Sequence, residues 1–172
     1  MRSVFFNNKK TMADITSETK LTWRDIEKSV DVLAGKIEKD GFKADCIIGI
    51  AAGGIIPLGL LVKKMKIDRV LTVSTKSYEK KQQKELVISY LPEVDLKGLK
   101  VLLVDEIADT GTTLSGVSQA LIEKCGVGEL KTAVLVMNQK NCGILPDFFA
   151  LSDDKWIVFP WEREEFPEYF EK

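Results

Sequence analysis

Lys100-Val-Leu-Leu-Val-Asp-Glu-Ile-Ala-Asp-Thr-Gly-Thr-Thr-Leu114 is the stretch of sequence on which the fold of this chain depends. It opens with an apolar run, Val101 to Val104, which has no polar alternation and so predicts a strand buried on both faces, as in a parallel sheet. After the stretch, apolar side chains recur at helical spacing as far as Cys125. Between strand and helix lies a small turn rich in hydroxyls, and backbone N–H groups at a helix N-terminus bind anions. The order predicted is therefore strand, anion-binding turn and helix.

Two carboxylates, Asp105 and Glu106, separate the apolar run from the turn. Carboxylates repel a bare phosphate, but they suit a ligand that carries sugar hydroxyls or a metal ion next to its phosphate. A phosphorylated ribose with Mg²⁺ satisfies both the acidic pair and the turn. The sequence therefore predicts a site for a sugar phosphate and a magnesium ion.

The same stretch closely resembles the signature of the type I phosphoribosyltransferases, which binds phosphoribosyl pyrophosphate (PRPP). The resemblance implies that Asp105 and Glu106 hold the ribose hydroxyls and Mg²⁺, the metal directly or through water. Glu106 departs mildly from the family, which often has two Asp residues here. The alternative is an ordinary turn with solvated acids, but the offsets of the acids, the glycine and the hydroxyls favour the family site. The residues expected to wrap the 5′-phosphate are Asp109, Thr110, Gly111, Thr112 and Thr113.

The length and charge of the chain limit the classes of protein it can belong to. Its 172 residues predict a single domain. The 25 basic and 26 acidic side chains give a net charge of −1, so neither a nucleic-acid partner nor a membrane partner is indicated. The apolar runs are too short to span a bilayer, and residues 1–6 lack the apolar core of a signal peptide. We therefore expect a cytoplasmic protein.

The counts of cysteine and histidine narrow the chemistry. Cys46, Cys125 and Cys142 are scattered, and we expect them to be reduced, as in the cytosol. The chain contains no histidine, which excludes a Ser-His-Asp triad, a histidine base and a histidine-ligated metal. A mechanism must therefore use carboxylates, lysine, backbone dipoles and an oxygen-bound Mg²⁺.

The pattern along the chain predicts a polar extension over residues 1–20 and one domain over residues 21–172. The domain opens with a helix whose apolar stripe runs from Ile26 to Ile37 and which ends at Gly41. The resemblance to the family implies that the carboxyl-terminal part of the domain includes a small hood, over about residues 138–165.

A second strand–turn–helix unit precedes the central stretch. A buried strand over Cys46–Ile50 is followed by Ala51-Ala52-Gly53-Gly54 and by a helix over Ile55–Met65. Such small residues let a ligand approach the backbone closely, although a Gly-Gly turn alone is a weak signal. Beside the central stretch, the turn resembles the pyrophosphate loop of the same family, which can carry a non-proline cis peptide, so we expect one at Ala51–Ala52. Purine members often have Arg or Lys where Ala52 stands, so another basic residue must substitute or pyrophosphate binding is weaker.

A polar, lysine-rich segment follows a predicted strand over Val70–Ser74 and precedes a short one over Leu86–Tyr90. Its plain interpretation is a solvated hairpin. The resemblance instead implies the mobile loop that closes over PRPP and excludes water, similar to that of bacterial xanthine-guanine phosphoribosyltransferases. The residues that carry this resemblance include Ser77, Tyr78 and Lys84.

The carboxyl-terminal segment carries the expected base site. Trp156 and Ile157, with Pro160-Trp161-Glu162 after them, resemble the base-binding hood of purine phosphoribosyltransferases. This implies that the Trp156 ring stacks on the purine and that the Ile157 backbone reads its exocyclic groups. A family lysine that ends a strand contacts the 6-oxo group, and it corresponds to Lys140, with the adjacent Gln139 as the alternative. The plain interpretation is that these aromatic side chains cover a core.

The fold class expected is α/β. Strand followed by helix, at residues 46–65 and 101–125, predicts a twisted parallel sheet flanked by helices. Both small turns follow strand C-termini, where open α/β sheets bind ligands. The resemblance covers residues 21–162 and implies the type I phosphoribosyltransferase fold.

The resemblance implies an enzyme of purine salvage that transfers the ribosyl 5′-phosphate group of PRPP to a 6-oxopurine and releases pyrophosphate. Asp109 is the expected catalytic residue, accepting a hydrogen bond from, or a proton on, purine N7. Mg²⁺ is the expected cofactor, PRPP and a purine base are the expected partners, and a homo-oligomer, dimer or tetramer, is the expected assembly. The alternatives are a non-catalytic regulator that senses PRPP, with which the missing cation at Ala52 agrees, and a phosphoribosyltransferase of other base specificity.

Overall fold

The computed structural model describes residues 17–80 and 83–170. They form two compact units. The larger unit is Arg24–Asp154, and the smaller one joins the chain up to Trp23 to the chain from Lys155 onward. Of the polar extension expected over residues 1–20, residues 1–16 lie outside the described part.

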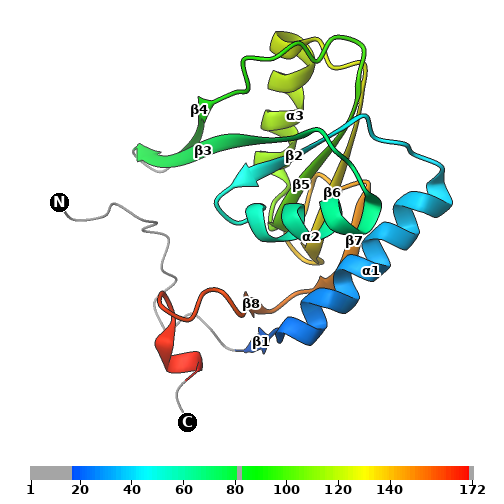
Figure 1. Cartoon of the computed structure of the whole chain (residues 1–172). Coiled ribbons are helices and arrows are strands. Elements are labelled where there is room, and N and C mark those ends of the chain that lie inside the picture. Colours follow the sequence, from blue (N-terminus) through cyan, green and yellow to red (C-terminus); the bar gives the residue numbers. More distant parts are fainter. Residues whose placement is uncertain (1–16, 81–82, 171–172) are drawn as a thin grey trace. The chain divides into compact units, whose positions relative to one another are not determined.

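A six-stranded sheet forms the middle of the larger unit (Figure 1). Its spatial order is β4-β3-β2-β5-β6-β7. Every neighbouring pair is parallel except β3 and β4, which form an antiparallel hairpin at one edge. The α/β class and the parallel sheet are confirmed, with one antiparallel strand added. The strands are β2 (Cys46–Ala51), β3 (Val70–Lys80), β4 (Gln83–Tyr90), β5 (Lys100–Ala108), β6 (Glu129–Asn138) and β7 (Phe148–Asp153).

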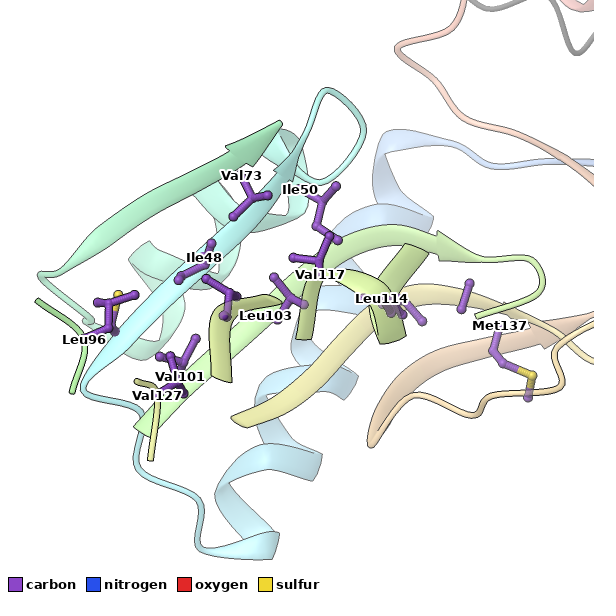
Figure 2. Packing of buried hydrophobic residues seen from close by; sticks show 14 residues of the cluster. Ile48, Ile50, Val73, Leu96, Val101, Leu103, Leu114, Val117, Val127 and Met137 are labelled. Atoms are coloured by element: carbon purple, nitrogen blue, oxygen red, sulfur yellow. The ribbon is translucent and has the colours of Figure 1, made fainter. Parts of the chain in front are cut away.

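Helices cover both faces of this sheet. Gly49 of β2 faces the second helix so closely that an added Cβ would lie 2.8 Å from Leu58 Cδ2. Side chains alternate along a strand, so Ile48 and Ile50 point to the opposite face, where they join the buried cluster of Figure 2. The third helix supplies Leu114, Val117 and Leu121 to that cluster. The helices are α1 (Trp23–Asp40), α2 (Ile55–Met65) and α3 (Thr112–Cys125).

The first helix follows the predicted pattern. The apolar stripe of α1 from Ile26 to Ile37 is buried, and its exposed Asp31 makes an ion pair of 2.7 Å with Lys64 of α2. α1 ends at Asp40, and Gly41 has φ +82°, a conformation that glycine adopts without steric cost. The predicted end of the helix is confirmed.

The smaller unit is built on two very short parallel strands, β1 (Glu18–Lys20) and β8 (Trp156–Val158). The Leu21 N–H continues the pairing by donating to the Val158 carbonyl over 2.9 Å. Aromatic rings pack beyond the strands, with Trp161 stacked at 4.7 Å on Phe159. A 3₁₀ turn, η2 (Pro167–Tyr169), follows. Residues 18–20, the last of the expected extension, are thus paired as a strand within the smaller unit.

Two simpler expectations concern the whole chain. Within the described ranges, no helix combines the length and the apolar character needed to cross a bilayer. The three cysteines are free thiols, and Cys46 is buried in the core.

Candidate active site

The acidic pair lies inside a strand and not after it. β5 continues past Val104 to Ala108, because Asp105 and Ile107 extend the parallel pairing with β6. The predicted end of the strand at Val104 is therefore wrong by four residues. Because side chains alternate along a strand, Asp105 shares the α3 face with Leu103, and Glu106 shares the other face with Val104. Both acids are partly buried at the carboxyl end of the strand.

Burial raises the pKa of Asp105 from 3.8 to about 7, because desolvation disfavours the charged carboxylate. The Glu106 backbone N–H donates to Asp105 Oδ1 over 2.9 Å and opposes part of this shift. At neutral pH the carboxyl group is therefore divided between its protonation states. A cation beside it would favour the charged form.

The small-residue loop lies next to the acidic pair, as β2 and β5 are neighbouring parallel strands. The peptide between Ala51 and Ala52 is cis, which confirms that expectation. An added Cβ on Gly53 would overlap the Glu106 carboxylate and lie 2.8 Å from Glu106 Cγ. Gly54 lies instead against the main chain, since an added Cβ would lie 2.6 Å from the Val104 carbonyl oxygen. Loop and acids therefore lie together at the carboxyl ends of β2 and β5.

The hydroxyl-rich turn leads into α3 through Gly111, which has φ +82°. The two threonine hydroxyls of Thr110 and Thr112 are 2.9 Å apart, and the Thr112 N–H donates to Thr110 Oγ1 over 3.3 Å. α3 begins at Thr112, so Thr113 lies in its first turn. The turn thus places hydroxyls and the positive end of a helix dipole beside the acidic strand end.

Asp109 is held by two side-chain amides that the sequence pattern did not single out. Asn138 Nδ2 donates to Asp109 Oδ1 over 2.8 Å, and Asn141 Nδ2 donates to the same oxygen over 3.3 Å. An asparagine at the end of an apolar strand has the signature of a turn residue. Nothing in the local sequence relates Asn138 to a carboxylate 29 residues earlier. Only the parallel pairing of β5 with β6 brings the two together.

The segment after β6 is also hydrogen-bonded to the hydroxyl-rich turn. The Gly143 and Ile144 N–H groups both donate to the Thr110 carbonyl, over 3.2 and 3.3 Å. Gly111 lies so close to this segment that an added Cβ would overlap the Ile144 carbonyl oxygen. The turn and the segment 138–144 are therefore packed together and hydrogen-bonded to each other.

The expected base contacts are divided between the two units. β6 ends at Asn138, so the strand-ending residue is neither Gln139 nor Lys140; both are exposed in the turn that follows. Trp156 and Ile157 belong to the smaller unit. There the Trp156 ring meets Phe166 edge-on at 6.0 Å, and its buried indole N–H has no acceptor among the described residues.

The lysine-rich segment forms the antiparallel ribbon of β3 and β4, in which Tyr78 pairs with Glu85 and Glu79 with Lys84. Residues 81–82, at its tip, lie outside the described residues, as do the side chains of Ser77, Tyr78 and Lys84. The hairpin is confirmed, and closure over PRPP stays a prediction.

Comparison with known proteins agrees with this geometry. The family model for the phosphoribosyl transferase domain matches residues 18–165. A xanthine-guanine phosphoribosyltransferase from Nitratidesulfovibrio vulgaris (strain Hildenborough) is 29% identical over 146 residues, 84% of each chain. One from Desulfotalea psychrophila is 30% identical over 84% of this chain and 86% of its own.

Solved structures give the same result. A purine phosphoribosyltransferase from Pyrococcus horikoshii is 34% identical, with a TM-score of 0.74 over 84% of this chain and 93% of that one. A hypothetical protein from Neisseria gonorrhoeae with bound ppGpp is 28% identical, with a TM-score of 0.78 over 90% and 94%. Since the family model spans most of the sequence and these folds superimpose, the chain belongs to the phosphoribosyltransferase family.

Proposed function

We propose that this protein transfers the ribosyl 5′-phosphate group of PRPP to a 6-oxopurine base and releases pyrophosphate. One observation carries the proposal: the loop 51–54, the acids Asp105 and Glu106 and the turn 109–113 meet at the carboxyl ends of two neighbouring strands. Loop and turn suit the two phosphate ends of PRPP, and the acids between them suit its ribose hydroxyls. The relatives named xanthine-guanine phosphoribosyltransferase support a 6-oxopurine as the acceptor.

PRPP is bound in this proposal by backbone at both ends. The 5′-phosphate is bound by the hydroxyls and N–H groups of residues 109–113, at the N-terminus of α3. The pyrophosphate is bound along residues 51–54, where the glycines leave the main chain open. Ala52 supplies no cation there, so another basic residue must substitute or pyrophosphate binding is weaker.

Mg²⁺ fits the acidic pair. Within the described ranges no cluster of three or more acidic or thiol side chains could enclose a metal ion. Mg²⁺ does not require such a cage, since one or two carboxylates and substrate oxygens suffice. Asp105 and Glu106 are the residues that would hold it, directly or through water. When bound, the ion would neutralise charge on the departing pyrophosphate.

The reaction exchanges one bond at ribose C1. The bond to the pyrophosphate oxygen breaks, a bond to a base nitrogen forms, and the base loses one proton. By analogy with glycosyl transfer, the transition state resembles a ribosyl oxocarbenium ion. Asp109 accepts a hydrogen bond from, or takes the proton on, purine N7. Lys140 or Gln139 donates to the 6-oxo group, and stacking of the Trp156 ring on the purine stays a prediction from the sequence.

The test is to mix the protein with PRPP, Mg²⁺ and guanine, xanthine or hypoxanthine, and to analyse the products by mass spectrometry. The proposal expects the corresponding nucleoside 5′-monophosphate, and much less of it from Asp109→Ala. PRPP binding without nucleotide formation would instead support the PRPP-sensing regulator.

A further inference from the structure

Asn138 is the last residue of β6 and one of the few buried polar side chains of the described chain, with 8% of its surface exposed. Asp109, its partner, is exposed in the turn. A buried amide must satisfy both its donor and its acceptor, because an unpaired polar group inside a protein is costly. The partners of Asn138 therefore indicate what it is there to hold.

Both ends of the Asn138 amide are engaged. Its Oδ1 accepts from the backbone N–H groups of Lys140 and Asn141, over 3.0 Å each. Its Nδ2 donates to Asp109 Oδ1 over 2.8 Å. Two backbone donors on the oxygen fix the orientation of the amide, since a flip would lose both bonds. The turn that follows β6 thus orients the side-chain Nδ2 of Asn138 toward Asp109.

Asp109 receives both amide donors on one oxygen, because Asn141 Nδ2 also bonds Oδ1. Within the described ranges no group donates to Oδ2. A carboxylate pinned at one oxygen cannot rotate freely, so the other oxygen has a defined direction. Catalytic groups need such placement, to within about 0.5 Å.

We propose that Asn138 is a positioning residue, which fixes Asp109 through Oδ1 so that Oδ2 faces the purine. This inference rests on the purine transfer proposed above. In this role Asn138 acts through Asp109, and the same amide holds the backbone of Lys140. Asn141 is the weaker second member of this pair.

The decisive variant is Asn138→Asp. It keeps an oxygen for the two backbone N–H groups but cannot donate to Asp109. We expect kcat/KM for the base to fall about 10- to 100-fold, the range for a hydrogen bond to a charged group. In an Asp109→Ala background the same change should matter by less than about threefold, because the partner is already gone. An equal loss in both backgrounds, or wild-type kinetics in Asn138→Asp, would overturn the proposal.

A matched control is Gln119→Glu. Gln119 Nε2 donates to Glu123 Oε1 over 2.9 Å on the exposed side of α3, so this substitution makes the same chemical change away from the site. It should leave the kinetics unchanged. Should Asn138→Asp fail to fold, Asn141→Asp at an exposed position takes its place, with a loss of several-fold that again disappears in Asp109→Ala.

A readout independent of activity separates this inference from the proposed function. By NMR, the Asn138 side-chain amide protons should exchange slowly with water in the wild-type protein and faster in Asp109→Ala. Unchanged exchange would overturn the inference even in an active enzyme. An inactive wild-type protein with the expected exchange would remove the proposed function and leave the Asn138–Asp109 contact standing.

Discussion

The Glu106 side chain lies against the main chain of Gly53, so closely that a methyl group on Gly53 would occupy the place of the Glu106 carboxylate. The two residues come from different parts of the chain: Gly53 lies in the loop after β2, and Glu106 lies in β5. A glycine is therefore required where the acidic pair meets the proposed pyrophosphate loop. The contact is with the mobile end of a side chain, whereas Gly54 contacts main chain.

This difference predicts opposite behaviour for two neighbouring substitutions. Gly53→Ala should displace the Glu106 carboxylate and weaken PRPP–Mg²⁺ binding about tenfold by calorimetry, with little loss of stability. Gly54→Ala meets the Val104 and Ile50 carbonyl oxygens at 2.6 and 2.7 Å and should lower the free energy of unfolding by about 1–3 kcal/mol. Gly59→Ala, with open space around it, is the control. Unaltered PRPP affinity in Gly53→Ala would argue against Glu106 as a ligand.

Gly111 combines a positive φ with a close neighbour, and these two effects can be separated. Gly41 has the same φ of +82° but nothing within 4 Å of an added Cβ. Gly41→Ala should therefore show only the conformational cost, about 1–2 kcal/mol. Gly111→Ala adds the collision with Ile144, and Gly111→Val also fills the proposed phosphate turn. Both should abolish PRPP binding in calorimetry; intact binding would remove residues 109–113 from the phosphate site.

The pKa of Asp105 predicts a pH-dependent stability. Between pH 3.8 and about 7 the unfolded state binds fewer protons at this group than the folded state, so its contribution to stability falls as pH rises. Asp105→Asn keeps an acceptor for the Glu106 N–H and removes the titration. Above pH 7 the variant should be more stable than the wild type, by up to about 4 kcal/mol, and near pH 4 it should gain nothing. Urea unfolding across this range checks it, and a pH-independent difference would contradict it.

Kinetics of two variants decide whether Lys140 or Gln139 contacts the 6-oxo group. A lysine gives a charge-assisted hydrogen bond worth about 1.5–3 kcal/mol. Lys140→Ala should therefore reduce kcat/KM for guanine or hypoxanthine roughly ten- to a hundredfold and hardly affect adenine. The paired variant is Gln139→Ala. If that substitution alone impairs 6-oxopurines, the role belongs to Gln139; if neither does, the 6-oxo contact lies elsewhere.

Local periodicity explains what could be predicted. The helix over Ile55–Met65 has the predicted bounds, because its apolar residues, the glycines before it and Pro57 in its first turn are local signals. The continuation of β5 through Asp105 and Glu106 could not be seen, since polar residues extend a strand only when a neighbour such as β6 pairs with them. The pairing of Glu18 with Trp156 is equally invisible, as three-residue strands carry no period.

Some residues of the candidate site could likewise be predicted from the sequence, and others could not. Its acids and its 5′-phosphate turn are contiguous in sequence, within residues 105–113, so the central stretch is enough to assemble them, whereas the loop 51–54 reaches them through the parallel pairing of β2 with β5. Asn138 was missed because its partner, Asp109, is distant along the chain and the two meet only through sheet order. Contacts that depend on tertiary pairing are those that the sequence pattern left out.

Steady-state kinetics with PRPP, Mg²⁺ and four bases test the central claim most directly. The account predicts that guanine, xanthine or hypoxanthine is converted to its nucleoside monophosphate with one pyrophosphate released per nucleotide, and that adenine is a poor substrate. It predicts in addition that Asp109→Asn lowers kcat/KM for the base while the protein still binds PRPP. Adenine used as well as the 6-oxopurines, or no nucleotide formed from any base by a protein that binds PRPP, would contradict it.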